Sequence, residues 1–149
     1  MIDGFEPIKF EWKVDLRPSD LDPYHHVSSY LYLEYVIGSR WQYLAKHYGE
    51  DAFSLAEKGL GFFLTKSQMK YRRGITDAKQ ILVRSYVSEC YRNNRLVDVP
   101  FEIQSVDEMV TFCNGILSFA VMNVSNTRVP KIQPLPDWAF KYFFSPSPA

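Results

Sequence analysis

Hydrophobic and charged side chains alternate strictly near the start of the chain, over residues 8–17. The apolar members of this pattern are Ile8, Phe10, Trp12, Val14 and Leu16. Alternation of this kind is typical of a strand with one buried face and one face in water. Pro18 cannot donate a hydrogen bond to a neighbouring strand, so the strand is predicted to end before it.

After a polar loop, the spacing of apolar residues changes to that of a helix. The apolar positions recur every three or four residues, at Tyr30, Leu33, Ile37, Trp41, Leu44 and Tyr48. This spacing predicts a helix over about residues 27–48 that ends at Gly49, with one apolar stripe along its length. At 1.5 Å per residue the helix would be roughly 33 Å long, enough to cross a small domain. A short second helix is predicted over residues 51–58.

The rest of the chain has the pattern of strands separated by turns. Strands are predicted over residues 61–72, 80–92, 95–106 and 109–124, with turns at 93–94 and 107–108 and a bulge at 114–115. Prolines then break the pattern, and residues 144–149 are expected to form a flexible tail. One long helix among strands predicts a single α+β domain over residues 1–149, in which an antiparallel sheet packs one face on the helix.

Composition narrows the classes of partner. The 149 residues carry 17 Lys and Arg against 17 Asp and Glu, so the net charge is zero. This balance argues against nucleic acid and against a polybasic membrane anchor. The sequence has no apolar run of about 18 residues, so no membrane span is expected. With no basic, apolar leader either, the protein is predicted to be soluble and cytoplasmic.

Aromatic residues are numerous, with 11 Phe, 10 Tyr and 3 Trp. In a small neutral domain this area needs cover from the core, from a second subunit or from a ligand. The two cysteines, Cys90 and Cys113, lie far apart and fit neither a disulfide framework nor a zinc finger. They are interpreted as buried thiols in a reducing compartment.

Two residues stand out on the apolar stripe of the predicted helix. On a wheel of 100° per residue, Glu34 falls inside the stripe, where a carboxylate needs a partner or a raised pKa. It is either an ion pair at the edge of the sheet or a group that faces a polar pocket under the helix. Gly38 on the same face suggests close approach of the helix to a strand or to a bound chain.

The loop before the helix is the densest in chemistry, because Asp20, Asp22, His25 and His26 lie within seven residues. Adjacent histidines point in different directions and no third-ligand spacing follows, so no metal site is predicted. Asp22 could be a turn or cap carboxylate beside Pro23. It could equally attack a carbonyl or activate water, while N–H groups at the helix start polarise the carbonyl oxygen. The residue types alone leave both interpretations open.

The stretch over residues 20–30, DLDPYHHVSSY, followed by Glu34 and Arg40, resembles a known family. It is similar to the D-x-D-x-x-x-[HIV]-V loop of hotdog-fold acyl-CoA thioesterases, in particular the 4-hydroxybenzoyl-CoA thioesterase-like family. The resemblance implies an antiparallel five- or six-stranded sheet wrapped around a long central helix. It also implies hydrolysis of an acyl thioester, acyl-CoA by preference, without a metal or other cofactor. Such enzymes are homodimers or homotetramers with the active site between subunits.

The resemblance assigns roles to particular residues. Asp22 matches the catalytic carboxylate, as nucleophile or general base, and His26 would orient the site. The thioester carbonyl would point at N–H groups of residues 25–27. Substrate-binding positions are Tyr24, His25, Val27, Tyr30 and Glu34. The CoA phosphates could meet Arg72, Arg73 or Arg92, which are otherwise interpreted as a solvated strand face.

The loop also departs from the family pattern. His25 stands where the family often has glycine, and Ser28 and Ser29 stand where it often has two asparagines. These changes keep two alternatives open, a non-catalytic module that binds acyl thioesters and a thioesterase that acts on acyl carrier protein. A dehydratase is a third possibility that the loop fits less well. The neutral charge favours CoA over an acidic carrier protein.

Overall fold

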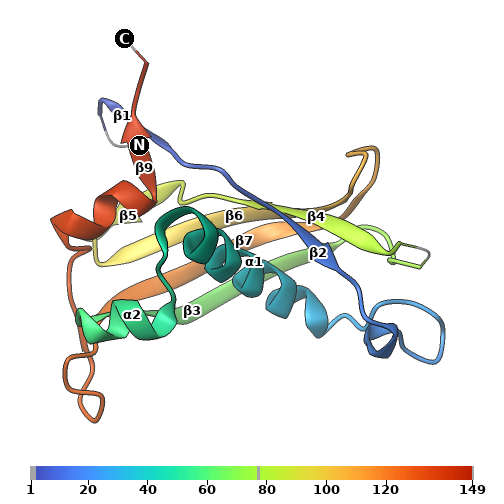
Figure 1. Ribbon diagram of the computed structural model, residues 1–149, viewed down its shortest axis with the longest axis horizontal. Coiled ribbons are helices and arrows are strands. Elements are labelled where there is room, and N and C mark those ends of the chain that lie inside the picture. The colour runs from blue at the N-terminus through green and yellow to red at the C-terminus, as the bar shows by residue number, and fades with distance from the viewer. Residues whose placement is uncertain (1–2, 77, 149) are drawn as a thin grey trace.

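The computed structural model describes residues 3–76 and 78–148, and Figure 1 shows the arrangement of its elements. The helices are α1 (Leu31–Tyr48) and α2 (Ala52–Glu57), with 3-10 turns η1 (Pro18–Asp20) and η2 (Asp137–Tyr142). The first strands are β1 (Phe5–Pro7), β2 (Phe10–Asp15), β3 (Leu60–Tyr71) and β4 (Gln80–Ser85). The later strands are β5 (Glu89–Tyr91), β6 (Leu96–Ser105), β7 (Thr111–Asn123), β8 (Lys131–Ile132) and β9 (Phe144–Pro146).

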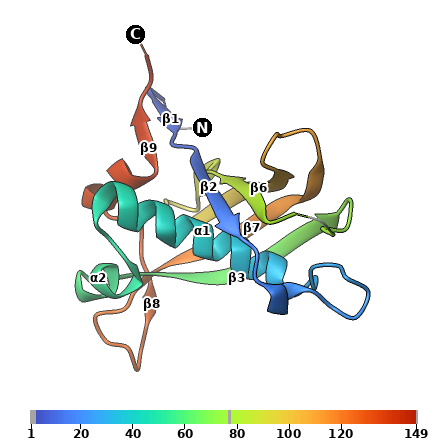
Figure 2. The same cartoon turned by 45° about the vertical axis from the view of Figure 1, so that its right-hand side comes forward.

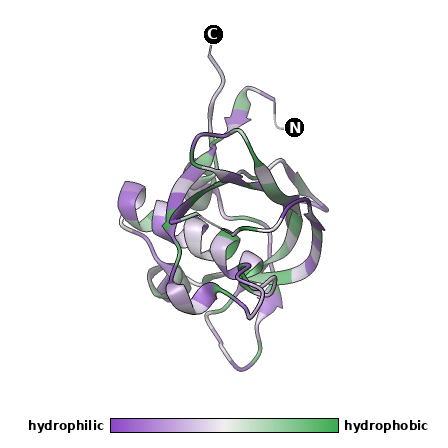
Figure 3. Cartoon of the chain, turned by 90° about the vertical axis from the view of Figure 1, so that its right-hand side faces the viewer, coloured by the Kyte–Doolittle hydropathy of each residue, from purple (hydrophilic) through white to green (hydrophobic). Residues whose placement is uncertain are grey.

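The main sheet curls around α1, as Figures 2 and 3 show from two further directions. Its strands follow the order β2-β4-β6-β7-β3, with β5 beside β6 and β8 beside β7, and all of these pairings are antiparallel. The sheet has seven strands among the described residues, because the two short strands add to the five long ones. The predicted α+β architecture, a sheet wrapped around a long helix, is confirmed.

The buried face of α1 differs from the predicted stripe. Its most buried side chains are Leu31, Tyr32, Tyr35, Val36, Ser39 and Leu44. Tyr30 precedes the helix and is 77% exposed, and Glu34 is exposed as well. The prediction took the wrong phase because apolar residues occupy both sides of the helix. Gly38 also lacks the expected close approach, since a Cβ there would meet no atom of the described residues within 4 Å.

Two strand boundaries were also predicted wrongly. The strand expected over residues 80–92 is divided into β4 and β5. At the break, the N–H of Tyr86 donates to the carbonyl of Pro100, which has no N–H to return the bond. The bulge expected at residues 114–115 lies instead where Ile103 and Gln104 pair with β7. Gly115 itself keeps regular pairing, and a Cβ there would lie 1.8 Å from the carbonyl oxygen of Gln68.

The end of the chain is more ordered than predicted. Residues 144–146 form β9, which pairs antiparallel with β1, and Phe144 is 4% exposed. The expected flexible tail over 144–149 is therefore wrong at its start, and residue 149 lies outside the described residues. Between residues 3 and 148, as far as they are described, no helix is long and apolar enough to cross a membrane.

Candidate active site

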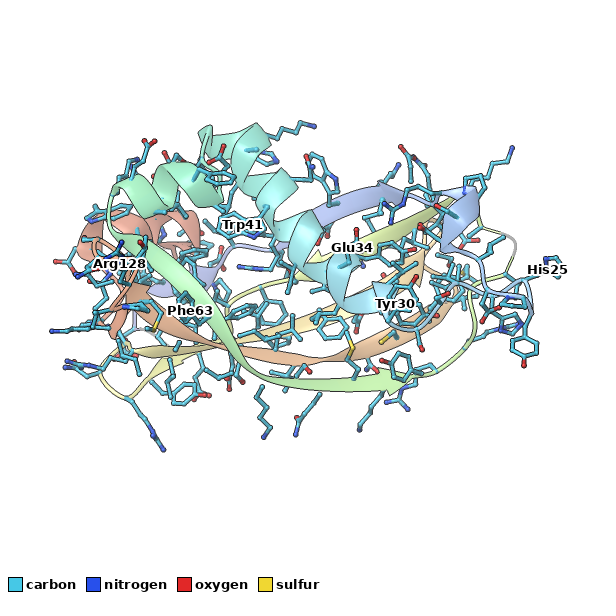
Figure 4. All side chains as sticks on the ribbon, turned by 90° about the horizontal axis from the view of Figure 1, so that it is seen from below. His25, Tyr30, Glu34, Trp41, Phe63 and Arg128 are labelled. Carbon is cyan, nitrogen blue, oxygen red and sulfur yellow. The ribbon has the colours of Figure 1, made fainter. Side chains whose placement is uncertain are left out.

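The loop before α1 closes on itself and protrudes at one end of the molecule, where Figure 4 labels His25. Leu21 and Val27 form an isolated antiparallel bridge, and the N–H of Asp22 donates to the carbonyl of His26 at 2.7 Å. The N–H of His25 in turn donates to the carbonyl of Asp22 at 3.0 Å. His25 has φ of +62°, a left-handed conformation that favours glycine. This conformation gives a physical reason for the glycine that the resembling family often carries here.

Asp22 holds this loop together through one of its two carboxylate oxygens. Its Oδ1 accepts hydrogen bonds from the N–H of Tyr24 at 2.8 Å and the N–H of His26 at 3.1 Å. This arrangement is a turn stabilised by an aspartate side chain. Among the described residues no donor contacts Oδ2, and the side chain is partly exposed. Asp22 is thus a turn carboxylate, and its second oxygen remains accessible to a water or a substrate.

The N–H groups that were expected to bind a carbonyl oxygen already have acceptors. Those of His25 and His26 donate to Asp22, to its carbonyl and its Oδ1 respectively. That of Val27 donates to the carbonyl of Ile75 at 2.9 Å, and this bond ties the loop to the turn after β3. The expected donors at residues 25–27 therefore stabilise the loop and are not available to a ligand.

The available donors lie slightly further along the chain. The N–H of Ser28 donates to the carbonyl of Asp20 at 2.9 Å, and α1 begins at Leu31. Between them, the N–H groups of Ser29 and Tyr30 find no acceptor among the described residues. Unpaired N–H groups at the start of a helix carry partial positive charge and bind negative oxygen. Ser29 and Tyr30 are therefore the candidates for polarising a carbonyl.

Asp20 anchors the loop from beneath, a role that the sequence did not predict. Its side chain is 2% exposed, and its Oδ2 accepts a hydrogen bond from the hydroxyl of Tyr35 at 2.8 Å. The Arg17 Nε lies 2.9 Å from Oδ1, and the Arg17 N–H donates to Oδ2 at 3.1 Å. Burial by itself would raise the pKa of Asp20, but these hydrogen bonds outweigh it and lower the pKa below its ordinary value.

Of the loop side chains at residues 24–27, three are exposed to solvent and one is buried in the core. Tyr24 is 80% exposed, and His25 and His26 are exposed as well. His26 packs its ring on the turn after β3, since a Cβ at Gly74 would lie 2.7 Å from its Nδ1. Val27 is buried in the core at 4% exposure, so its side chain does not face a ligand.

Glu34 lies on the side of α1 that faces β2. One carboxylate oxygen is 3.5 Å from Nη2 of Arg17, and the side chain is 58% exposed. Of the two interpretations of this residue, the structure therefore shows the ion pair at the edge of the sheet. This ion pair lies beside a groove between α1 and β2, which Glu34 lines together with Asp15 and Gln42.

The three arginines proposed for CoA lie at two different ends of the sheet. Arg72 and Arg73 follow β3 beside the loop, and both backbone N–H groups donate to the carbonyl of Phe112, at 2.8 and 3.1 Å. The Arg72 Nε also donates to Asn114 Oδ1 at 3.0 Å. Arg92 belongs to the turn before β6, at the far end of the sheet from the loop. Within one chain, Arg92 therefore cannot form a common binding surface with Arg72 and Arg73.

The loop has no evident metal-binding arrangement. In the parts of the chain that the structure describes, no three His, Cys, Asp or Glu side chains are grouped so that they could hold a metal ion. The chemistry that the loop offers is a carboxylate oxygen and two backbone donors at a helix start. A carboxylate of this kind can act on a carbonyl whose oxygen the donors polarise.

Comparison with known proteins agrees with this chemistry. The profile of the thioesterase-like superfamily matches residues 16–141, so the chain belongs to this superfamily. Membership supports thioester hydrolysis as the general class of reaction. A search of the curated proteins gave no match.

Several known structures share the fold at low sequence identity. DHNA-CoA thioesterase from Staphylococcus aureus has a TM-score of 0.72 and 17% identity, over 90% of this chain and 88% of that one. A 1,4-dihydroxy-2-naphthoyl-CoA thioesterase from Synechocystis has a TM-score of 0.75 and 12% identity, over 90% and 94%. YbaW from Escherichia coli has a TM-score of 0.70 and 19% identity, over 89% and 95%. These likenesses, with the profile match, confirm the hotdog fold that the loop motif predicted.

Proposed function

We propose that the protein hydrolyses an acyl-CoA thioester to the free acid and CoA. The observation that carries this proposal is that one segment before α1 holds both a carboxylate with a free oxygen, on Asp22, and the unengaged N–H groups of Ser29 and Tyr30. This segment lies in a chain of the thioesterase-like superfamily. In this proposal the thioester carbonyl oxygen accepts hydrogen bonds from the two N–H groups, which stabilise the negative charge that develops in the transition state.

Asp22 Oδ2 supplies the second half of the reaction. As a general base it takes a proton from a water that attacks the carbonyl carbon, and as a nucleophile it attacks that carbon itself. In both cases the C–S bond breaks and CoA leaves as a thiolate, which is then protonated. In the nucleophilic route the acyl group is left on Asp22 as a mixed anhydride, and a water then cleaves this anhydride to release the free acid and restore the carboxylate. His26, beside Asp22 in the loop, would hydrogen-bond the substrate or the attacking water.

A second copy of the chain would complete the site. β3 is twelve residues long, and among the described residues it has a neighbour, β7, on one side only, so its other edge is open to another strand. Tyr24 and Tyr30, in and directly after the loop, are 80% and 77% exposed, and exposed apolar surface of this kind marks a contact site for another molecule. A homodimer paired through β3 would cover part of this apolar surface, and two dimers could form a tetramer.

The CoA part of the substrate would lie near the end of β3. Arg72 and Arg73 are exposed there, on the same end of the molecule as the loop. Two guanidinium groups suit the phosphates of CoA. An acyl carrier protein as donor of the acyl group is the alternative, and the chain's zero net charge favours CoA over an acidic carrier.

Substitution of Asp22 tests the proposal. Asp22→Asn keeps a carbonyl oxygen that can accept the two loop N–H bonds, but it removes the base. We expect hydrolysis of acyl-CoA, followed by thiol release, to fall at least about a hundredfold. Asp51→Asn is the matched control, because Asp51 accepts the N–H of Ser54 at 2.7 Å as the cap of α2 and lies away from the loop.

Each outcome has a distinct meaning. Full activity in Asp22→Asn, with unchanged melting temperature and oligomer size, would overturn the role of Asp22. Saturable acyl-CoA binding without turnover by the wild type would favour the non-catalytic binding module. Turnover of acyl carrier protein thioesters alone would assign the carrier protein as the acyl donor.

A further inference from the structure

A cavity of about 160 Å³ lies between α1 and the inner face of the sheet, away from the Asp22 loop. Its walls are mostly apolar and include Ile37, Trp41 and Leu44 from α1, Phe62 from β3 and Val99 from β6. Figure 4 places Trp41 between the helix and the strand that carries Phe63. A closed cavity of about 150 Å³ with similar walls holds a benzene molecule in another protein. The volume therefore suits an aromatic ring or a medium-length alkyl chain.

One lining residue carries a charge. Arg40 of α1 is the single ionisable side chain among the described residues that line the cavity. Its Nη1 donates to the hydroxyl of Ser85 at 2.9 Å, and its Cζ lies 4.2 Å from the centre of the Phe10 ring. A guanidinium has five N–H donors, so this bond leaves most of them available.

The charge of Arg40 has no partner carboxylate in the part of the chain that the structure describes. No Asp or Glu of the described residues lies within 4.0 Å of the guanidinium. Burial lowers the pKa of Arg40 to about 9, so the group remains charged at neutral pH. Its other neighbours, Ser85 and Phe10, are neutral. A half-buried charge without a counter-charge still loses part of its hydration, and an anion in the cavity would offset that cost.

We propose that this cavity binds an amphipathic carboxylate, with the apolar part against Trp41 and Phe62 and the carboxylate on the guanidinium of Arg40. Two planar groups of this kind match in a bidentate hydrogen-bonded pair. Such a carboxylate has two sources. It is either a free medium-chain acid, such as the proposed hydrolysis would release, or the far carboxylate of a dicarboxylic acyl thioester. Binding of a carboxylate in the cavity does not depend on the proposed thioester hydrolysis; the assignment of that carboxylate to a hydrolysis product or a substrate rests on it.

Calorimetric titration with octanoate tests the site without using hydrolysis. We expect saturable binding to the wild type, weaker binding of the neutral octanamide, and at least a tenfold loss of octanoate affinity in Arg40→Met. Arg40→Lys, which keeps the charge, should retain part of the affinity. Lys46→Met is the matched control, because it removes an exposed charge from the same helix outside the cavity. Equal binding of octanoate and octanamide, or equal binding by wild type and Arg40→Met, would overturn the proposal.

A second titration separates the two sources. Suberyl-CoA and octanoyl-CoA differ in one terminal carboxylate, so tighter binding of suberyl-CoA that depends on Arg40 would assign the dicarboxylic thioester. Binding of octanoate without this preference would assign the free acid. Absence of any octanoate binding in a folded wild type would refute the site. Loss of turnover in Asp22→Asn with octanoate binding intact would show that the two proposals stand separately.

Discussion

Removal of the Asp20 carboxylate should destabilise the fold and loosen the Asp22 loop. Asp20 accepts the Tyr35 hydroxyl at 2.8 Å and lies almost wholly inside the protein, at 2% exposure. In Asp20→Ala the Tyr35 hydroxyl loses its partner while it remains buried. In Asp20→Asn one oxygen can still accept that hydroxyl, but the new amide N–H group faces the Arg17 guanidinium, so two donors oppose each other.

The size of the effect follows from these contacts. A buried hydroxyl left without its partner costs about 1–3 kcal/mol, and a hydrogen bond to a charged group contributes about 1.5–3 kcal/mol. Arg17 adds little, because its side chain is 56% exposed and can turn to solvent. We therefore expect Asp20→Ala to cost about 3 kcal/mol and Asp20→Asn about half of that. For a chain of this length, 3 kcal/mol lowers the melting temperature by about 6–12 °C.

Thermal unfolding followed by circular dichroism provides the assay. Asp15→Asn is the control, since Asp15 is exposed and its carboxylate accepts only the side-chain amide of Gln80, at 2.7 Å. The proposed acyl-CoA turnover should also fall in Asp20→Ala, because loss of the side-chain anchor would loosen the backbone at residue 20, whose carbonyl holds the N–H of Ser28 directly before the proposed donors. Melting temperatures of Asp20→Ala and Asp15→Asn within a degree or so of each other would refute this reasoning.

The pH dependence gives a second check on Asp20. The folded protein lowers the pKa of this carboxyl below its ordinary value of about 4, so its stabilisation is complete above that pH. The stabilisation is lost as the pH falls through the lowered pKa. The difference in stability between wild type and Asp20→Asn should be constant from about pH 5 to 7 and shrink below about pH 4. A difference that grows on acidification would contradict this assignment.

Three further substitutions or reactions test other parts of the structure. Gly115→Ala should disrupt the pairing of β3 with β7, because its Cβ would lie 1.8 Å from the Gln68 carbonyl oxygen, and the variant should be recovered largely unfolded or with a much lower melting temperature. Gly38→Ala should raise the melting temperature by about 2–4 °C, since alanine favours the helix and its Cβ meets no atom of the described residues within 4 Å. A fall would mean that another surface covers this position. Burial raises the pKa values of the Cys90 and Cys113 thiols to about 11, so both should react slowly with a disulfide reagent at pH 8 in the native protein and quickly once it is unfolded.

The sequence predicted the architecture well because the signals were local. Alternation over residues 8–17 marked a strand, and the loop at residues 20–30 carried a family motif directly before the helix. A turn position for Asp22 beside Pro23 was one of the two interpretations that the residues left open, and the structure shows that turn. These features depend on residues close together in the chain, so they could be predicted without tertiary contacts.

The contacts around the loop could not be predicted in the same way. Tyr35 reaches Asp20 from fifteen residues away, and only the helix phase determines that it points inward. That phase was ambiguous, because the fully buried residues of α1 and the half-buried Ile37 and Trp41, which line the cavity between the helix and the sheet, are both apolar. The use of the N–H groups at residues 25–27 depends on backbone conformation, including the positive φ of His25. A motif alone does not specify such bonds.

In the proposed site, the reacting groups and the surface around them are held in place in different ways. The reacting groups are fixed within one chain, because Asp22 is held by its own loop and Ser28, directly before Ser29, is held by Asp20. The surface around these groups is not fixed by contacts within one chain, since Tyr24 and Tyr30 extend into solvent. Substitutions within the loop should therefore lower kcat in a protein of unchanged oligomeric state. In the proposed homodimer, substitutions along the open edge of β3 should weaken assembly and raise KM, because binding energy from the second chain would be lost while the reacting groups stay in place.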